Sequence, residues 1–86
     1  MQSSLISKIE KARIYAEQPE RFNVLSLRIE VRGDSSTHTA EFGPDGWTCD
    51  CFFFHDAGTC SHTMALERML DQMLPEAYRP AFSIAT

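Results

Sequence analysis

Long hydrophobic runs are missing from this chain of 86 residues. No apolar stretch approaches the roughly 18–20 residues that cross a bilayer as a helix, so a transmembrane segment is not expected. The first residues carry no basic cluster ahead of an apolar core, so a secretion signal is not expected either. These two absences favour an intracellular, cytoplasmic location.

Internal repeats and low-complexity segments are also missing, and glycine and proline are sparse at 4 residues each. With 43% hydrophobic and 23% charged residues, the composition is that of a folded protein and excludes a collagen-like fibre or a disordered linker. The length fits a single domain, 1–86. Because so short a chain hides only roughly 60% of its surface on folding, its apolar core is thin.

An excess of positive charge is absent as well. The 8 basic and 12 acidic side chains give a net charge of −4, and the acidic excess lies after Gly43. A strongly basic nucleic-acid binder has the opposite balance. No phosphate-binding loop, dinucleotide fingerprint or nucleophile–base–acid set is present, so we expect neither an enzyme nor a small-molecule substrate.

Hydrophobic periodicity predicts an α+β fold that begins with a helix. The helix runs from Ser4 to about Glu17, with an apolar face on which Leu5 and Ile9 lie. Alternating apolar and polar residues then predict a strand over 23–32 and a second over 37–42, which pair as an antiparallel hairpin. After a turn at 43–46, residues 47–51 are expected to be extended and to add a third strand.

The periodicity becomes helical again from about Ser61 to Leu74, and Pro75 ends this C-terminal helix. In the tail, Tyr78 and Phe82 either fold back on the core or belong to a frayed end.

The three cysteines and one histidine show a paired spacing. Cys49 and Cys51 lie two apart in an extended segment, so both sulfurs point to one side. Cys60 and His62 lie at the start of the C-terminal helix, where the helix N-terminus favours a thiolate. An odd number of cysteines argues against a disulfide framework. A small chain with a thin core needs another source of stability, such as a bound metal ion.

Three thiolates and one imidazole form the ligand set of a closed, tetrahedral, structural Zn²⁺ site. The sequence therefore predicts one zinc ion held by Cys49, Cys51, Cys60 and His62. One competing interpretation is that His55 takes the place of His62, since it lies within the loop between the two halves. A second is that the thiols are free and buried, and a third is a strained disulfide between Cys49 and Cys51.

This C-x-C and C-x-H pattern resembles the SWIM zinc-finger family. Ala65 matches the small residue three positions after the histidine, and Leu66 and Leu70 suit the apolar helix that follows. The resemblance implies a β-hairpin, a helix and one structural zinc, in a module that binds DNA or other proteins. Where the family often has Lys or Arg between the last two ligands, this chain has Ser61, which removes a candidate phosphate contact.

The expected organisation and contact surface follow. We expect the N-terminal helix in 1–18, the hairpin and third strand in 22–51, the SWIM-like finger in 47–74 and the tail in 75–86.

The favoured function is a stand-alone adaptor that binds a protein partner, and the alternative is a module that binds DNA or single-stranded nucleic acid. Of the three consecutive rings, either all three cover the zinc site and the core, or two pack and one is exposed as a contact. The candidate contact residues are Arg28, Arg32, Phe52, Phe53 and Phe54.

Overall fold

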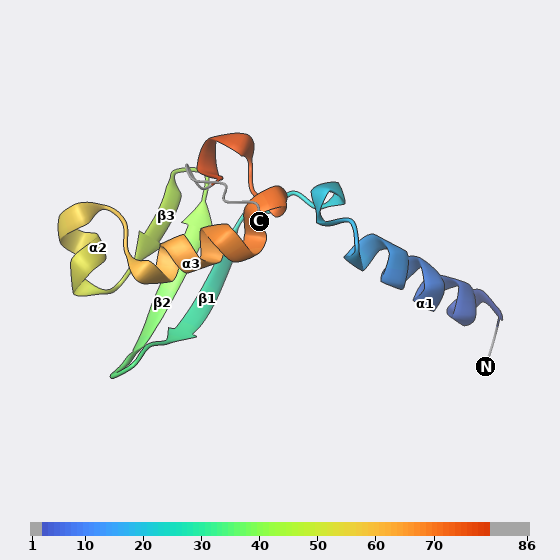
Figure 1. Cartoon of the computed structure of the whole chain (residues 1–86), viewed down its shortest axis with the longest axis horizontal. Coiled ribbons are helices and arrows are strands. Elements are labelled where there is room, and N and C mark those ends of the chain that lie inside the picture. Colours follow the sequence, from blue (N-terminus) through green and yellow to red (C-terminus); the bar gives the residue numbers. More distant parts are fainter. Residues whose placement is uncertain (1–2, 80–86) are drawn as a thin grey trace.

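The computed structural model describes residues 3–79, which form the expected α+β fold (Figure 1). An N-terminal helix precedes a three-stranded antiparallel sheet, and a C-terminal helix follows it. The α-helices and strands are α1 (Ser3–Ala16), β1 (Leu27–Arg32), β2 (Thr37–Gly43), β3 (Gly46–Cys49), α2 (Phe52–Ala57) and α3 (Ser61–Leu70). Short 3-10 helices are η1 (Pro19–Arg21), η2 (Asp71–Met73) and η3 (Glu76–Tyr78).

The sheet has the strand order β1-β2-β3, with both neighbouring pairs antiparallel. In the first pair Leu27 lies opposite Phe42, and in the second Gly43 lies opposite Gly46. The predicted hairpin, the turn that follows it and the third strand are thus confirmed.

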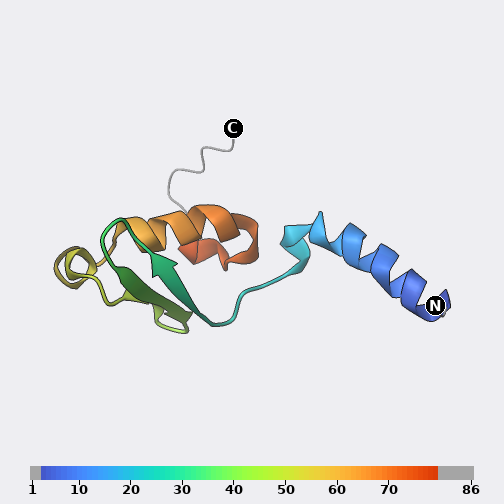
Figure 2. The same ribbon diagram turned by 90° about the horizontal axis from the view of Figure 1, so that it is seen from below.

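The two faces of the sheet differ as the alternation in the sequence predicts. In β1 the apolar residues are half-buried and the charged ones are exposed. The helix α3 runs along the apolar face (Figure 2). The most buried apolar side chains lie between these two layers or at the junction with the cysteines: Ala40, Phe42, Leu66, Leu74, Cys51 and Cys60.

An aromatic corner closes the end of the sheet that holds the β2–β3 turn. The Phe42 ring lies 4.9 Å from the Trp47 ring and 5.1 Å from the Tyr78 ring, the latter edge-on. Gly46 has a φ of 98°, and a Cβ there would lie 3.0 Å from a ring carbon of Tyr78. The turn therefore needs glycine both for its backbone and for the ring packed against it. Tyr78 does fold back on the core, whereas Phe82 lies outside the described residues.

The first strand is shorter than predicted, because it begins at Leu27 and not at Asn23. The β2 strand ends at Gly43, one residue beyond the partner of Leu27, so residues before Ser26 have no partner on β2. The backbone of the preceding segment bonds elsewhere: the Val24 N–H donates to the carbonyl of Met73 at 2.6 Å.

The C-terminal helix also ends earlier than predicted, at Leu70 instead of Leu74. The chain tightens into η2, and the Leu74 N–H donates to the carbonyl of Asp71 at 3.2 Å. This tighter turn brings Leu74 into the core, where it is 1% exposed. Burial of one large side chain thus replaces the last turn of a regular helix.

The short helix α2, which lies between the two halves of the cysteine pattern, was not predicted. It ends at Gly58, whose φ of 76° is a left-handed cap and whose N–H donates to the carbonyl of Phe54 at 2.8 Å. The expectation that at most one of the three phenylalanines is exposed was wrong. On this short helix Phe52 is 85% exposed and Phe53 is 64% exposed, while Phe54 is half-buried.

The helix α1 forms as predicted but its apolar face covers nothing. No residue between Ser3 and Ala16 is buried. In both views the helix extends away from the sheet and α3 (Figures 1 and 2). The radius of gyration is 16.1 Å, whereas a compact chain of this length has about 12 Å. Within the described residues, no helix is both long and apolar enough to span a membrane.

Candidate metal centre

Four side chains from three consecutive elements meet at one end of the sheet. Their ligand atoms, three sulfurs and one imidazole nitrogen, all lie within 4.8 Å of one another. Cys49 ends β3 and Cys51 precedes α2, whereas Cys60 and His62 begin α3. The structure thus brings together the four predicted ligands Cys49, Cys51, Cys60 and His62.

The distances suit a tetrahedral ion. The Nδ1 atom of His62 lies 3.7 Å from the sulfur of Cys49 and 3.6 Å from the sulfur of Cys60. Around a tetrahedral ion with bonds of about 2.3 Å to sulfur and about 2.0–2.1 Å to nitrogen, such atoms are about 3.6 Å apart. Cys51 and Cys60 are buried and the other two ligands are half-buried, so the site is largely shielded from water.

Asp50, between the first two ligands, anchors them to the neighbouring strand. Its N–H donates to the carbonyl of Thr39 at 3.2 Å, and its carboxylate accepts from the Thr39 N–H at 3.1 Å. The Thr39 N–H, with a smaller effect from His38, holds the pKa of the Asp50 carboxyl below its usual range. This pair fixes the backbone between Cys49 and Cys51 after β3 has ended.

Cys60 is the N-cap of α3, a position that usually belongs to Ser, Thr, Asp or Asn. Its sulfur accepts from the Thr63 N–H at 3.5 Å, and its own N–H donates to the Thr63 hydroxyl at 3.2 Å. Burial raises the pKa of the Cys60 thiol, but the bond from the Thr63 N–H, together with neighbouring side chains that include Cys51 and His62, outweighs it and lowers the pKa to about 6. The helix start therefore prepares one thiolate.

Cys49 behaves differently, because burial outweighs the one backbone N–H, that of Cys51, which lowers the pKa of its thiol. Burial raises the pKa of its thiol to about 11, so the side chain stays protonated at neutral pH until a cation displaces the proton. The sulfurs of Cys49 and Cys60 thus differ in how easily they lose a proton. A bound cation is needed to hold both of them as thiolates.

The ring of His62 is supported on its outer side by β2 and by the hairpin turn. The His38 ring lies 4.8 Å away, and the Nδ1 of His38 bonds to the Asp50 carboxylate at 3.1 Å. The second nitrogen of His38 bonds to the Ser36 hydroxyl at 2.9 Å. At Gly33 a Cβ would lie 3.5 Å from the Nε2 of His62. The hairpin therefore keeps Nδ1 turned toward the sulfurs.

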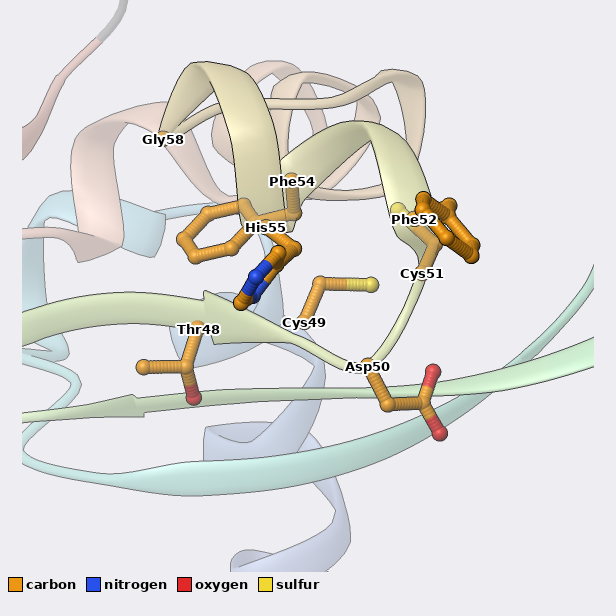
Figure 3. Close-up of a pocket in the computed structure, with 8 residues that line it drawn as sticks. All are labelled: Thr48, Cys49, Asp50, Cys51, Phe52, Phe54, His55 and Gly58. Carbon is orange, nitrogen blue, oxygen red and sulfur yellow. The ribbon is translucent and has the colours of Figure 1, made fainter.

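Figure 3 shows His55 with the other residues that line a pocket beside Cys49 and Cys51. Phe54 and His55 reach from α2 toward Thr48 and Cys49, and with their neighbours they line an open hollow of about 630 Å³. His55 is exposed and does not belong to the group of four ligands, so His62 is the histidine that the fold supplies.

The two predicted arginine contacts lie on the exposed face of β1, and Glu30 lies between them. The Arg28 guanidinium lies 3.3 Å from the Glu41 carboxylate on β2, and both side chains are largely exposed. This face of the sheet therefore carries both signs of charge.

Comparison of the chain with models of protein families, with curated proteins and with solved structures found no match. The description of the site therefore rests on its geometry: three cysteines and one histidine form a cluster that can hold one structural metal ion.

Sequence reasoning missed the residues that support the ligands, namely Thr63, Asp50 and His38. A threonine three residues after an N-cap cysteine is the one signal that the sequence offered, because it satisfies the spacing of a capping box.

Proposed function

We propose that this protein is a small interaction module stapled by one structural zinc ion. The donor set supports zinc: thiolates are soft ligands, whereas Mg²⁺ and Ca²⁺ select oxygen. The four ligands would complete a tetrahedron and leave no open position for a substrate or a reactive water. Bound there, zinc supplies no chemistry except coordination, which argues for a binding protein and against an enzyme.

The order of the elements supports a SWIM-type assignment. The pattern Cys49, Cys51, Cys60 and His62 sits after a β-hairpin and opens into a helix, as the resemblance implies. We propose this family on the strength of the four ligands, their spacing and the helix that follows them.

We propose a protein partner, which binds at Phe52 and Phe53. These adjacent rings are 85% and 64% exposed on a short helix that lies between two candidate ligands, its N-cap Cys51 and the N-cap of α3, Cys60. Exposed rings of this size cost solubility and gain most from being covered by another protein. The hollow beside Phe52 gives a partner a recess for a side chain.

Charge supports protein over nucleic acid. Arg28 is paired with Glu41, and Glu30 lies next to it, so a phosphate would have to displace a carboxylate. The net charge is −4, and three thiolates around one divalent ion make it more negative by one further unit.

One experiment separates these two functions. Fluorescence anisotropy of labelled single- and double-stranded DNA is measured with the zinc-loaded protein at low and near-physiological salt. The expected result is no binding even at low salt. Micromolar binding that weakens steeply with salt would contradict the proposal, because phosphate contacts release counterions.

A second experiment tests the surface. Zinc-loaded wild-type protein and a Phe52→Ser, Phe53→Ser variant are immobilised and used to capture partners from a lysate of the native host. The control is Met69→Ser, because Met69 is 76% exposed on α3, outside this surface. A partner retained by wild type and by the control but lost by the double variant, at equal zinc content, supports the proposal. Equal capture by all three proteins contradicts it.

A further inference from the structure

The proposed function does not use α1, although this helix exposes more apolar side chains than any other element. Leu5, Ile6, Ile9 and Ile14 are 46–50% exposed, and none of the 14 residues is buried. Isolated helices of this length are marginal in water, and helices in proteins draw most of their stability from packing an apolar face. The helix therefore needs a surface to pack against.

The spacing of the apolar face indicates what that surface is. Leu5, Ile9, Ala12 and Ala16 follow one another at intervals of four, three and four, which is the seam of a two-stranded coiled coil. This seam has large side chains in its first half and small ones in its second half. We propose that α1 pairs with α1 of a second copy of this chain, in antiparallel orientation.

Antiparallel pairing matches large side chains with small ones in every layer. Leu5 lies opposite the partner's Ala16, and Ile9 lies opposite the partner's Ala12, with the same two contacts repeated by symmetry. A parallel pair would instead stack leucine on leucine at one end and alanine on alanine at the other. The antiparallel register thus fills the seam evenly along the helix.

Charge favours the same orientation. In a parallel coiled coil, the residue just before a seam position lies next to the partner's residue five positions further along the chain. Lys8, which precedes the seam residue Ile9, would therefore lie next to the partner's Arg13, and the two positive charges would repel. Antiparallel pairing separates these two cations. Arg13 then lies across from the partner's Ile6, where its aliphatic stem covers an exposed side chain.

The shape of the molecule leaves room for this pairing. The helix extends away from the sheet and α3 in both views, so the two folded bodies would lie at opposite ends of the helix pair (Figures 1 and 2). A helix of 14 residues is about 21 Å long. Because two such helices bury less than the roughly 1,200 Å² of a standard interface, the dimer depends on concentration.

The test is the mass of the zinc-loaded full chain in solution, measured by sedimentation and light scattering over a range of concentrations. The expected mass rises toward twice 9.8 kDa with increasing concentration. Ile9→Glu is expected to keep the chain monomeric. Ile14→Glu is the matched control, because Ile14 is 49% exposed against 46% for Ile9 but lies off the seam.

Two results would overturn pairing through this seam: a monomer at every concentration, or equal effects of the Ile9 and Ile14 variants. Orientation is tested by Arg13→Glu, which strengthens a parallel pair by meeting the partner's Lys8 but weakens the antiparallel one beside the partner's Ile6. A stronger dimer in this variant would overturn the antiparallel arrangement. Zinc content, measured in parallel, separates a failure of this pairing from a failure of the metal site.

Discussion

Cys60 and Thr63 bond to each other in both directions at the start of α3. The sulfur of Cys60 accepts from the Thr63 N–H at 3.5 Å, while the Thr63 hydroxyl accepts from the Cys60 N–H at 3.2 Å and donates to the Cys60 carbonyl at 3.2 Å. This is a capping box in which a thiol takes the place of the usual hydroxyl. One residue pair therefore starts the helix and also orients a metal ligand.

Removing the Thr63 hydroxyl should destabilise the protein, even when the replacement side chain has the same shape as threonine. Thr63→Val leaves the Cys60 N–H without its side-chain acceptor in a site where Thr63 is 2% exposed. The expected cost is about 1–3 kcal/mol in the free energy of unfolding. Denaturant unfolding of the zinc-loaded protein measures it. Thr63→Ser keeps the hydroxyl and should lose less, so equal losses in the two variants would contradict this role.

Metal removal should unfold the region from β3 to α3. Structural zinc contributes roughly 10–16 kcal/mol of apparent binding energy, which is comparable to the whole stability of a small domain at about 5–15 kcal/mol. Native mass spectrometry is expected to find one zinc ion per chain. Thermal unfolding followed by circular dichroism should lose its cooperative transition after chelation, and an unchanged melting temperature would show that the ion is dispensable.

Asp50 should affect metal affinity although it is not a ligand. Asp50→Ala removes the carboxylate that accepts from the Thr39 N–H and bonds to His38, so the backbone between Cys49 and Cys51 is less well held. Loss of such outer-shell bonds typically weakens metal affinity by roughly 10–100-fold. Competition with a chromophoric chelator measures the change. Asp56→Ala, which removes an exposed carboxylate from α2, is the control and should leave the affinity unchanged.

Two glycines that flank one turn should respond differently to substitution. Gly46→Ala forces an L residue to a φ of 98° and brings a Cβ to 3.0 Å from the Tyr78 ring. We expect a loss of about 1–3 kcal/mol, measured by denaturant unfolding. Gly43→Ala meets no atom within 4 Å of its Cβ and should change stability by less than about 1 kcal/mol. Similar losses at both positions would contradict this account of the corner.

Much of the local structure could be predicted from the sequence, because it depends on neighbours along the chain. The alternation of apolar and polar residues in 27–32 and 37–42 indicates a sheet with one solvent-exposed face, and each strand was predicted on that basis. Four ligands could be proposed, with His55 as the competing histidine, since a C-x-C pair points one way in extended backbone and C-x-H opens a helix. Helix α1 followed from periodicity alone.

Other features could not be predicted because they depend on contacts between distant segments. The short helix α2 carries three phenylalanines in a row, which gives no helical periodicity, and its position follows from the ligands on either side. The early end of α3 reflects the burial of Leu74, and the late start of β1 reflects the end of its partner strand. Likewise, His38 reaches His62 only because β2 lies beside the start of α3.

The sequence by itself determined the donor set, the order of helix and strands, and the sign of the charge, since these depend on residue type and short-range spacing. Only the tertiary structure decided which histidine joins the sulfurs, which of the three rings of α2 face solvent, and that the apolar face of α1 is left uncovered. The physical reason is that burial and ligand geometry arise where separate elements meet, and periodicity within one element does not specify what it meets.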